Sequence, residues 1–281
     1  MRISDAHIHF LSDRFFQLLA GDAAAACGTL NWDPPPADPV ELANRWVENL
    51  NQNGVDRAVL IASLPGDVSS VVAARAAYPD RFLAFAMVNP VGGPPPSPDV
   101  DAICLFPAMH RFSIAGEEAA RAIESASTVF VHCGVLTVGV RKKLKLPSLF
   151  DMRYSNPLDL HSVALKYPEK RFILPHFGAG LLREALMLCD LCPNVHLDTS
   201  SSNSWIKYEN LTLAEVFQRA LDVVGPGRLL FGTDSSFFPR GWNRPVFEAQ
   251  RAALESLNVP ASDQQKIFAE NLDSLFPLRS N

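Results

Sequence analysis

The chain has 281 residues, of which 48% are hydrophobic and 20% are charged, and its net charge is −5. This composition is typical of a globular enzyme with a sizeable core, and the negative charge argues against non-specific binding to nucleic acid. No apolar run approaches the ~18 residues of a membrane-spanning helix, and no signal sequence opens the chain. The five cysteines form no disulfide pattern, so we expect a cytoplasmic protein.

The chain alternates between short apolar runs and helical segments. The apolar runs predict eight strands, at residues 2–10, 55–62, 82–88, 103–106, 128–132, 172–175, 195–198 and 229–231. Helices are predicted at residues 40–52, 67–78, 116–127, 157–167, 181–191, 212–224, 244–257 and 262–276. Eight such units predict a parallel (β/α)8 TIM barrel that forms a single domain over residues 1–281. No glycine-rich fingerprint follows the first strand, which argues against an open dinucleotide-binding sheet.

Two segments interrupt this alternation. Residues 11–37 contain an alanine-rich stretch and three consecutive prolines, and we expect a long irregular loop of the kind that serves as a functional lid. Residues 89–100 are rich in proline and glycine, which prevents a helix there. The third and fourth strands are therefore expected to be joined by a bare loop.

Polar residues occur where several predicted strands end, which is where barrels of this type carry their active sites. The first strand ends in His7 and His9, whose side chains project from the same face. His132, His176 and Asp234 end the fifth, sixth and eighth strands. Imidazoles with one carboxylate form a ligand set suited to zinc, with a position left for water. The alternatives are a core role for His132 and a helix-capping role for Asp234.

Two further residues have expected supporting roles. His176 can be a ligand or a catalytic base, and we favour catalysis because four ligands are available without it. Asp5 shares the face of His7 and His9. It is expected to lie deeper in the barrel and to orient an imidazole ring.

Four motifs in this order resemble those of the amidohydrolase superfamily. They are Asp5-Ala6-His7-Ile8-His9, Val131-His132, Pro175-His176-Phe177-Gly178 and Gly232-Thr233-Asp234. The most similar branch is the amidohydrolase-related group that includes aminocarboxymuconate-semialdehyde decarboxylase-like enzymes. Asp198-Thr199-Ser200 and a closing helix with Ile267, Asn271 and Leu275-Phe276 fit this resemblance. It implies a metal ion held by His7, His9, His132 and Asp234, with His176 contacting water or substrate.

The resemblance also bears on the number of metal ions. Two-metal members have a carboxylated lysine at the end of the fourth strand, where this chain has Cys104. A bridging carbamate cannot form there, so we predict one divalent ion, with Zn²⁺ favoured over Mn²⁺ or Fe²⁺. Cys104 as a ligand is a minor alternative.

Basic residues near the predicted strand ends indicate a small anionic substrate, such as a carboxylate. His110 and Arg111 follow the fourth strand, and Arg240 lies among aromatic residues after the eighth. A guanidinium in such surroundings can bind a carboxylate through two hydrogen bonds. The basic run at 141–145 is expected to be a solvated surface. The sequence is also compatible with a homodimer.

Together these features predict a mononuclear metal-dependent hydrolase that acts on an amide, lactone or ester through a metal-activated water. Asp234 would accept a proton from that water, and His176 would polarise the carbonyl group. The alternative is a metal-dependent non-oxidative decarboxylase of an aromatic or unsaturated acid, which needs the same ligands. A multinuclear phosphoesterase is disfavoured because Asp234 is followed by Ser235-Ser236 rather than by a further histidine. A barrel without catalytic activity is the remaining alternative.

Overall fold

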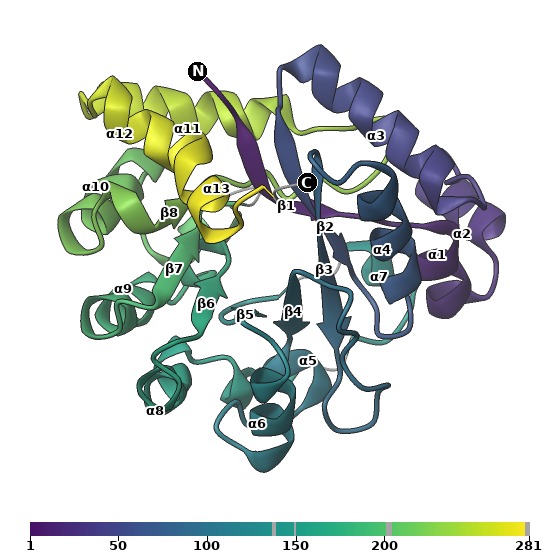
Figure 1. The fold of residues 1–281 in the computed structure, drawn as a ribbon, viewed down its shortest axis with the longest axis horizontal. Helices are drawn as coiled ribbons and strands as arrows, with labels where there is room; N and C mark the ends of the chain where they lie inside the picture. Colours follow the sequence, from purple (N-terminus) through teal and green to yellow (C-terminus); the bar gives the residue numbers. More distant parts are fainter. Residues whose placement is uncertain (137–138, 149, 201–203, 279–281) are drawn as a thin grey trace.

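The computed structural model describes residues 1–136, 139–148, 150–200 and 204–278. Its centre is an eight-stranded parallel sheet in which each strand pairs with the next along the chain, as Figure 1 shows. The strands are β1 (Ser4–His9), β2 (Arg57–Ala62), β3 (Phe82–Val88), β4 (Ala102–Leu105), β5 (Thr128–Val131), β6 (Arg171–Leu174), β7 (Val195–Asp198) and β8 (Leu229–Leu230).

The sheet closes on itself because the first strand also contacts the last. The N–H of Ala6 donates to the carbonyl of Phe231, and Ile8 forms a parallel bridge with Ser235. The predicted TIM barrel is therefore confirmed.

Apolar side chains on both faces of the strands hold the barrel together. One buried cluster includes Val59, Phe85 and Phe130 together with Leu272 and Phe276 from the C-terminal region, and a larger cluster lies between the strands and the surrounding helices. Strands buried on both faces are read from sequence as continuous apolar runs, which is why all eight predicted strands are present. Arg57 donates to the main-chain carbonyl of Phe276, and Arg171 donates to that of Leu275. These two hydrogen bonds hold the C-terminal segment against the sheet.

Helices surround the sheet (Figure 1). Those predicted from sequence appear as α3 (Pro39–Asn53), α4 (Val68–Ala77), α6 (Glu117–Glu124), α8 (His161–Lys166), α9 (Leu182–Leu191), α10 (Leu213–Val223) and α11 (Arg244–Ser256). Their ends are shifted, most of all in α8, where the predicted first turn is a 3₁₀ turn instead. Shorter helices are α5 (Pro107–His110) and α7 (Gly139–Lys143). Single 3₁₀ turns lie at Met152–Tyr154, Pro157–Leu160, His176–Gly178, Ser204–Tyr208 and Pro226–Arg228.

The loop and cap predictions have mixed outcomes. No helix lies between β3 and β4, all of which the structure describes, as expected for the bare loop. The capping box of Thr212 and Glu215 is present. The last predicted helix is divided into α12 (Ala261–Gln265), a π-helical turn (Lys266–Glu270) and α13 (Asn271–Leu275). Pro260, rather than Ser262, is at its N-cap.

The prediction of an irregular loop at residues 11–37 is wrong. This segment contains α1 (Asp13–Ala20) and α2 (Ala23–Leu30), which lie side by side at one edge of the molecule in Figure 1. Ser12 and Asp22 cap the two helices by accepting hydrogen bonds from main-chain N–H groups. The helices bury a cluster of their own, formed by Phe15, Phe16, Ala23, Ala26, Cys27 and Leu30. We call this pair the α1–α2 cap.

Asp67 connects the α1–α2 cap to the start of α4. Its fully buried carboxyl group accepts hydrogen bonds from Ser12 Oγ at 2.9 Å and from Ser70 Oγ at 2.6 Å. Burial raises the pKa of Asp67 to about 6, although the two hydroxyl groups act in the opposite direction. The folded protein therefore holds a proton on Asp67 more tightly than the unfolded chain does.

This difference predicts a pH-dependent stability. Between pH values of about 4 and 6 the folded state binds more protons at Asp67, so the free energy of unfolding should fall as the pH rises, by about 1–3 kcal/mol. Urea denaturation should show that the stability of the wild type relative to Asp67→Asn decreases over this range. The exposed Asp80 provides the control Asp80→Asn, and a pH-independent difference for Asp67→Asn would contradict the prediction.

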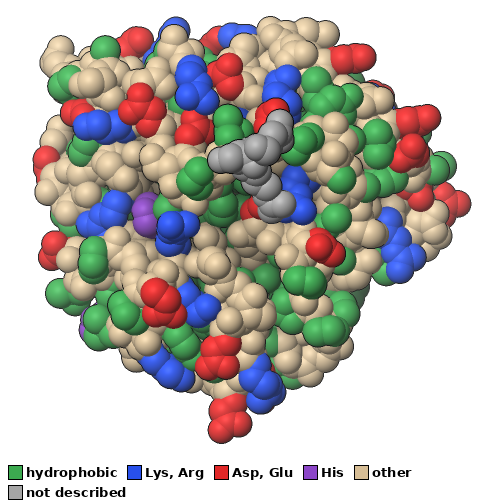
Figure 2. Space-filling model, in the orientation of Figure 1, with side chains coloured by type: hydrophobic (Ala, Val, Ile, Leu, Met, Phe, Trp, Pro, Cys, Tyr) green, Lys and Arg blue, Asp and Glu red, His purple; other side chains and the backbone are tan. Residues whose placement is uncertain are grey.

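The outer surface in Figure 2 shows acidic and basic side chains interspersed over the face that is viewed. No single-sign patch dominates this face. Among the described residues, no helix combines the length and the apolar character needed to cross a membrane.

Candidate metal centre

Three side chains, two from β1 and one from the turn after β8, converge at the mouth of the barrel. The pairing of β1 with β2 is irregular between Asp5 and Ile8, and the rings of His7 and His9 meet with their Nε2 atoms 3.3 Å apart. Asp234 Oδ1 lies 3.1 Å from His9 Nε2 and 3.7 Å from His7 Nε2. These three residues form a group whose ligand atoms all lie within 4.8 Å of one another.

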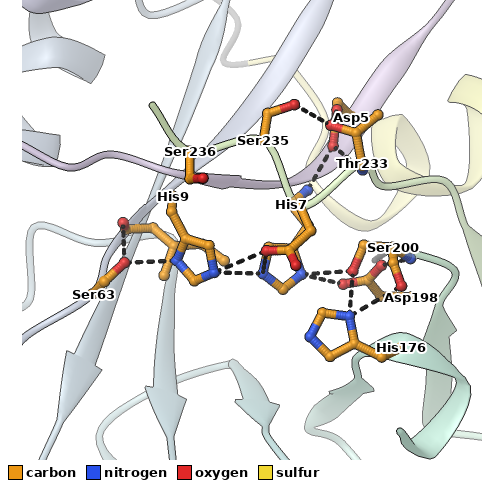
Figure 3. Close-up of polar contacts among 12 residues, drawn as sticks. Asp5, His7, His9, Ser63, His176, Asp198, Ser200, Thr233, Ser235 and Ser236 are labelled. Atoms are coloured by element: carbon orange, nitrogen blue, oxygen red, sulfur yellow. Dashed lines mark hydrogen bonds and ion pairs between the residues drawn. The ribbon is translucent and has the colours of Figure 1, made fainter. Parts of the chain in front are cut away.

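The hydrogen-bond partner of Nδ1 in each histidine ring determines which ring nitrogen carries the proton. His7 Nδ1 lies 2.6 Å from Asp198 Oδ2, and His9 Nδ1 lies 2.6 Å from Ser63 Oγ (Figure 3). Because the Ser63 hydroxyl donates to the carbonyl of Ile61, it accepts the proton of His9 Nδ1. In the neutral rings both Nε2 atoms are then unprotonated lone pairs.

This arrangement fits a metal ion. Two unprotonated nitrogens that face each other repel unless a cation lies between them. Ligands bound tetrahedrally to Zn²⁺ at about 2.0–2.1 Å are themselves about 3.3 Å apart, which agrees with the separation of the two Nε2 atoms. The site also favours positive charge: burial lowers the pKa of His7, but the carboxylates of Asp198, Asp234 and Asp5 outweigh this effect and raise it.

A tight turn after β8 presents Asp234 to the two histidines. Asp234 has a φ of 56°, and its N–H donates to the carbonyl of His7. Burial alone would raise the pKa of its carboxyl group, but His9, His7 and His176 hold that pKa well below its usual range. Asp234 is therefore an ionised donor over the whole range in which the protein is expected to work.

Asp5 has a different role from the one expected. Its buried carboxyl group accepts hydrogen bonds from the main-chain N–H groups of His7 and Thr233 and from the indole Nε1 of Trp242, and it contacts no imidazole through a hydrogen bond. Asp5 thus fixes the backbone on which His7 lies. The carboxylate that orients the His7 ring is Asp198.

His132 and His176 lie next to this group. The ring centroid of His176 is 5.0 Å from that of His7 and 5.4 Å from that of His132. His176 Nδ1 lies 3.0 Å from the carbonyl oxygen of Ser200, which assigns the proton to Nδ1 and leaves Nε2 as an acceptor. His132 Nε2 is buried without a hydrogen-bond partner, although His132 is not within the three-residue group. Its role as a fourth ligand remains a prediction.

The electrostatics keep both rings neutral. Burial is the main cause that lowers the pKa of His132 well below its usual value, and the neighbouring His176 and His7 add to it. Burial also lowers the pKa of His176, although the carboxylate of Asp234 opposes it. Neutral imidazoles are the form that binds metal or accepts a proton.

The structure separates the other candidates. Cys104 is fully buried inside the barrel, and burial raises its pKa well above the usual value, so it stays a thiol rather than the thiolate that binds metals. Arg240 lines the cavity above the metal group, whereas His110 and Arg111 do not. Burial, with Arg141 nearby, lowers the pKa of His110 to about 4. His110 and Arg111, which were predicted to contact the substrate, therefore do not lie at this cavity.

A cavity of about 530 Å³ opens directly onto His7, His9, His132, His176 and Asp234. Its walls include Phe15 and Leu19 of α1 and four basic residues, namely Arg141, Lys143, Lys207 and Arg240. A volume of this size is typical of a small-molecule site.

Three supporting residues escaped the sequence analysis. Ser63 carries no distinctive signal, because serines after strands are common, and the motif that contains Ser200 did not reveal its contacts. Asp198 ends β7, and its place in the Asp198-Thr199-Ser200 motif could have identified it as a partner of His7. Ser200 Oγ lies 2.9 Å from the Nδ1 atoms of both His7 and His176 (Figure 3).

The contact between Asp198 and His7 gives a direct test. Asp198→Asn keeps the shape of the side chain but removes the negative charge that favours a proton on His7 Nδ1. We expect the affinity for Zn²⁺ to fall about 10–100-fold, measured by competition with a chelator. Ser63→Ala removes an uncharged partner of His9 and should have a smaller effect. Equal effects of the two substitutions would contradict a special role for the carboxylate.

An eight-stranded parallel barrel with a His-His-Asp group at its first and last strands defines a TIM-barrel protein with a candidate metal site. Residues 4–278 match the family model described as Amidohydrolase. The chain belongs to the amidohydrolase family, which confirms the resemblance of its motifs. Members of this superfamily are metal-dependent enzymes.

Solved structures share this fold. The proposed 2-pyrone-4,6-dicarboxylic acid hydrolase of Pseudomonas putida is 15% identical with a TM-score of 0.65, and the alignment covers 100% of this chain and 99% of that one. The 5-carboxyvanillate decarboxylase LigW of Sphingomonas paucimobilis is 12% identical with a TM-score of 0.61, covering 99% of each chain. The fold therefore occurs with both hydrolase and decarboxylase assignments.

A relative among characterised sequences is protein fluG of Emericella nidulans. It is 35% identical over 85 residues, which are 30% of this chain and 10% of fluG. The match thus covers only a small part of that much longer protein.

Proposed function

We propose that the protein is a mononuclear metal-dependent hydrolase of a small anionic ester, lactone or amide. The observation that carries this proposal is the convergence of the Nε2 atoms of His7 and His9, which lie 3.3 Å apart beside Asp234, while the Nδ1 atom of each ring contacts Asp198 or Ser63. These residues would hold the ion, with His132 as a further donor. Nitrogen and carboxylate ligands favour Zn²⁺, and Mn²⁺ or Fe²⁺ also accept them.

When bound, the ion would polarise a carbonyl group and lower the pKa of a water molecule. Asp234 is ionised and can accept a proton from the attacking water. His176 is neutral, with its proton held on Nδ1 by Ser200, so that its Nε2 can accept a proton or, once protonated, stabilise a developing oxyanion. The absence of a lysine at Cys104 supports a single ion.

Metal analysis tests this proposal directly. Protein purified without chelator should contain close to one equivalent of a divalent ion per chain and should hydrolyse esters or lactones of organic acids. A metal content below about half an equivalent after incubation with Zn²⁺ would contradict the proposed ligand set.

Arg240 is the proposed binding group for the substrate carboxylate. Its guanidinium stacks on Phe237 at 4.5 Å and donates to the carbonyl of Asp234 and to Ser236 Oγ. Among the described residues it forms no ion pair, so donors are available for an anion at the cavity wall.

Replacing this guanidinium should weaken substrate binding more than it slows the chemical step. For Arg240→Gln we expect KM for an anionic substrate to rise about 10–100-fold with a small change in kcat. Steady-state kinetics measure both constants. Arg219→Gln, an exposed position on α10, is the control. An unchanged KM in Arg240→Gln would remove Arg240 from the binding site.

A decarboxylase is the second candidate. The neutral His176 beside the metal group can also deliver a proton to carbon, and LigW shows that the fold occurs in a decarboxylase. A panel of aromatic acids and lactones separates the two reactions. Hydrolysis releases acid in a pH-stat without carbon dioxide, whereas decarboxylation releases carbon dioxide. Carbon dioxide release alone would replace the hydrolase proposal.

A further inference from the structure

Helix α1 and residues that flank the α1–α2 cap contribute an apolar wall to the cavity. The buried cluster of the cap is flanked by partly buried side chains, of which Leu11, Leu19, Trp32 and Leu64 also line the cavity, together with Phe15. None of these five side chains can make the hydrogen bonds or ion pairs that a small polar substrate needs, apart from the indole N–H of Trp32. An apolar part of a ligand that packs against these side chains would bury their apolar surface, which favours binding.

The same cavity carries strong positive charge. Arg141, Lys143, Lys207 and Arg240 all line it, and among the described residues none of the four forms an ion pair. Asp234 is the one acidic residue in the described lining. Unpaired basic groups around a cavity attract and bind anions.

Aromatic rings join the apolar wall to two of these basic residues. Trp32 and Phe237 stack with their centroids 4.0 Å apart, Lys143 lies 5.8 Å from the Trp32 ring, and Arg240 lies 4.5 Å from the Phe237 ring. Apolar surface and positive charge therefore meet around the stacked rings of Trp32 and Phe237. A ligand that matches both has a charged group and a substantial apolar part.

We infer that the substrate is an amphipathic acid derivative, with an anionic group and an apolar body of about six carbons or more that lies against the α1–α2 cap. Leu19 is a specificity-determining residue for that body. This inference rests on the proposed action of the site on a small anionic molecule, and it separates the protein from an enzyme for compact dicarboxylates.

Calorimetric titration of the zinc-loaded full chain with butanoate, hexanoate and octanoate tests the inference without turnover. We expect the affinity to rise about fourfold for each added methylene, with a heat-capacity change that becomes more negative along the series. Leu19→Ala should reduce the gain between butanoate and octanoate at least about threefold. Leu18→Ala is the matched control, because Leu18 is 41% exposed on the same helix and does not line the cavity.

The outcomes distinguish this inference from the proposed function. An affinity independent of chain length, or equal losses in the Leu18 and Leu19 variants, would overturn the inference. Turnover of compact dicarboxylates without any gain from an alkyl chain would also overturn it, while supporting hydrolysis. Binding that increases with chain length in a protein that hydrolyses no ester, lactone or amide would support the inference and refute the proposed function.

Discussion

Asp234→Ala is expected to remove the metal ion and to lower kcat/KM by about 10³-fold or more. The substitution deletes the carboxylate that contacts His9 Nε2 at 3.1 Å and His7 Nε2 at 3.7 Å, and it leaves only imidazole rings to hold a divalent cation. The loss of the proposed proton acceptor acts in the same direction. Elemental analysis of the purified variant and steady-state kinetics measure the two effects.

Asp99→Ala, at an exposed position in the loop between β3 and β4, is the control for this substitution. It should retain both metal and activity. A full equivalent of tightly bound metal in Asp234→Ala would show that other residues hold the ion.

His176→Gln is expected to retain the metal and to lower kcat about 10²–10⁴-fold. His176 Nδ1 is held by the carbonyl of Ser200, and its ring lies beside His7 outside the three-residue group. The glutamine can keep a hydrogen bond to Ser200 but cannot transfer a proton as imidazole does. Metal content and kcat should therefore change independently, in contrast to Asp234→Ala.

His161→Gln, at the start of α8, is the matched histidine control. Loss of metal in His176→Gln would place His176 among the ligands. An unchanged kcat would exclude it from proton transfer.

The barrel could be predicted from the sequence because its strands are local features. Each strand is a short apolar run, buried on both faces by contacts that any apolar residue in that register can make. The α1–α2 cap could not be predicted in this way. Its helices are only eight residues each, and they are stabilised by contacts between Phe15, Phe16 and Leu30 that the local pattern does not reveal.

The candidate site shows the same division. The positions of His7, His9 and Asp234 follow from the rule that strand ends meet at one face of the barrel. Their hydrogen-bond partners do not, because Asp198 and Ser63 belong to β7 and to the end of β2, and only the closed barrel brings them to the histidines. Asp5 illustrates the limit: the pairing of β1 with β2 is irregular between Asp5 and Ile8, so simple strand alternation does not place its side chain, and its partners are Thr233 and Trp242.

Closure of the sheet between β1 and β8 has a consequence for how the protein matures. The donors of the proposed ion come from His7 and His9 in β1 and from Asp234 after β8, and the hydrogen bond from Asp234 N–H to the His7 carbonyl joins these two segments. An ion bound there would link β1, the first strand of the barrel to be synthesised, to the segment that follows β8, the last strand. A nascent chain that ends before Asp234 lacks one of the three residues of this group. Metal binding would therefore require the closed barrel and would stabilise only that folded state.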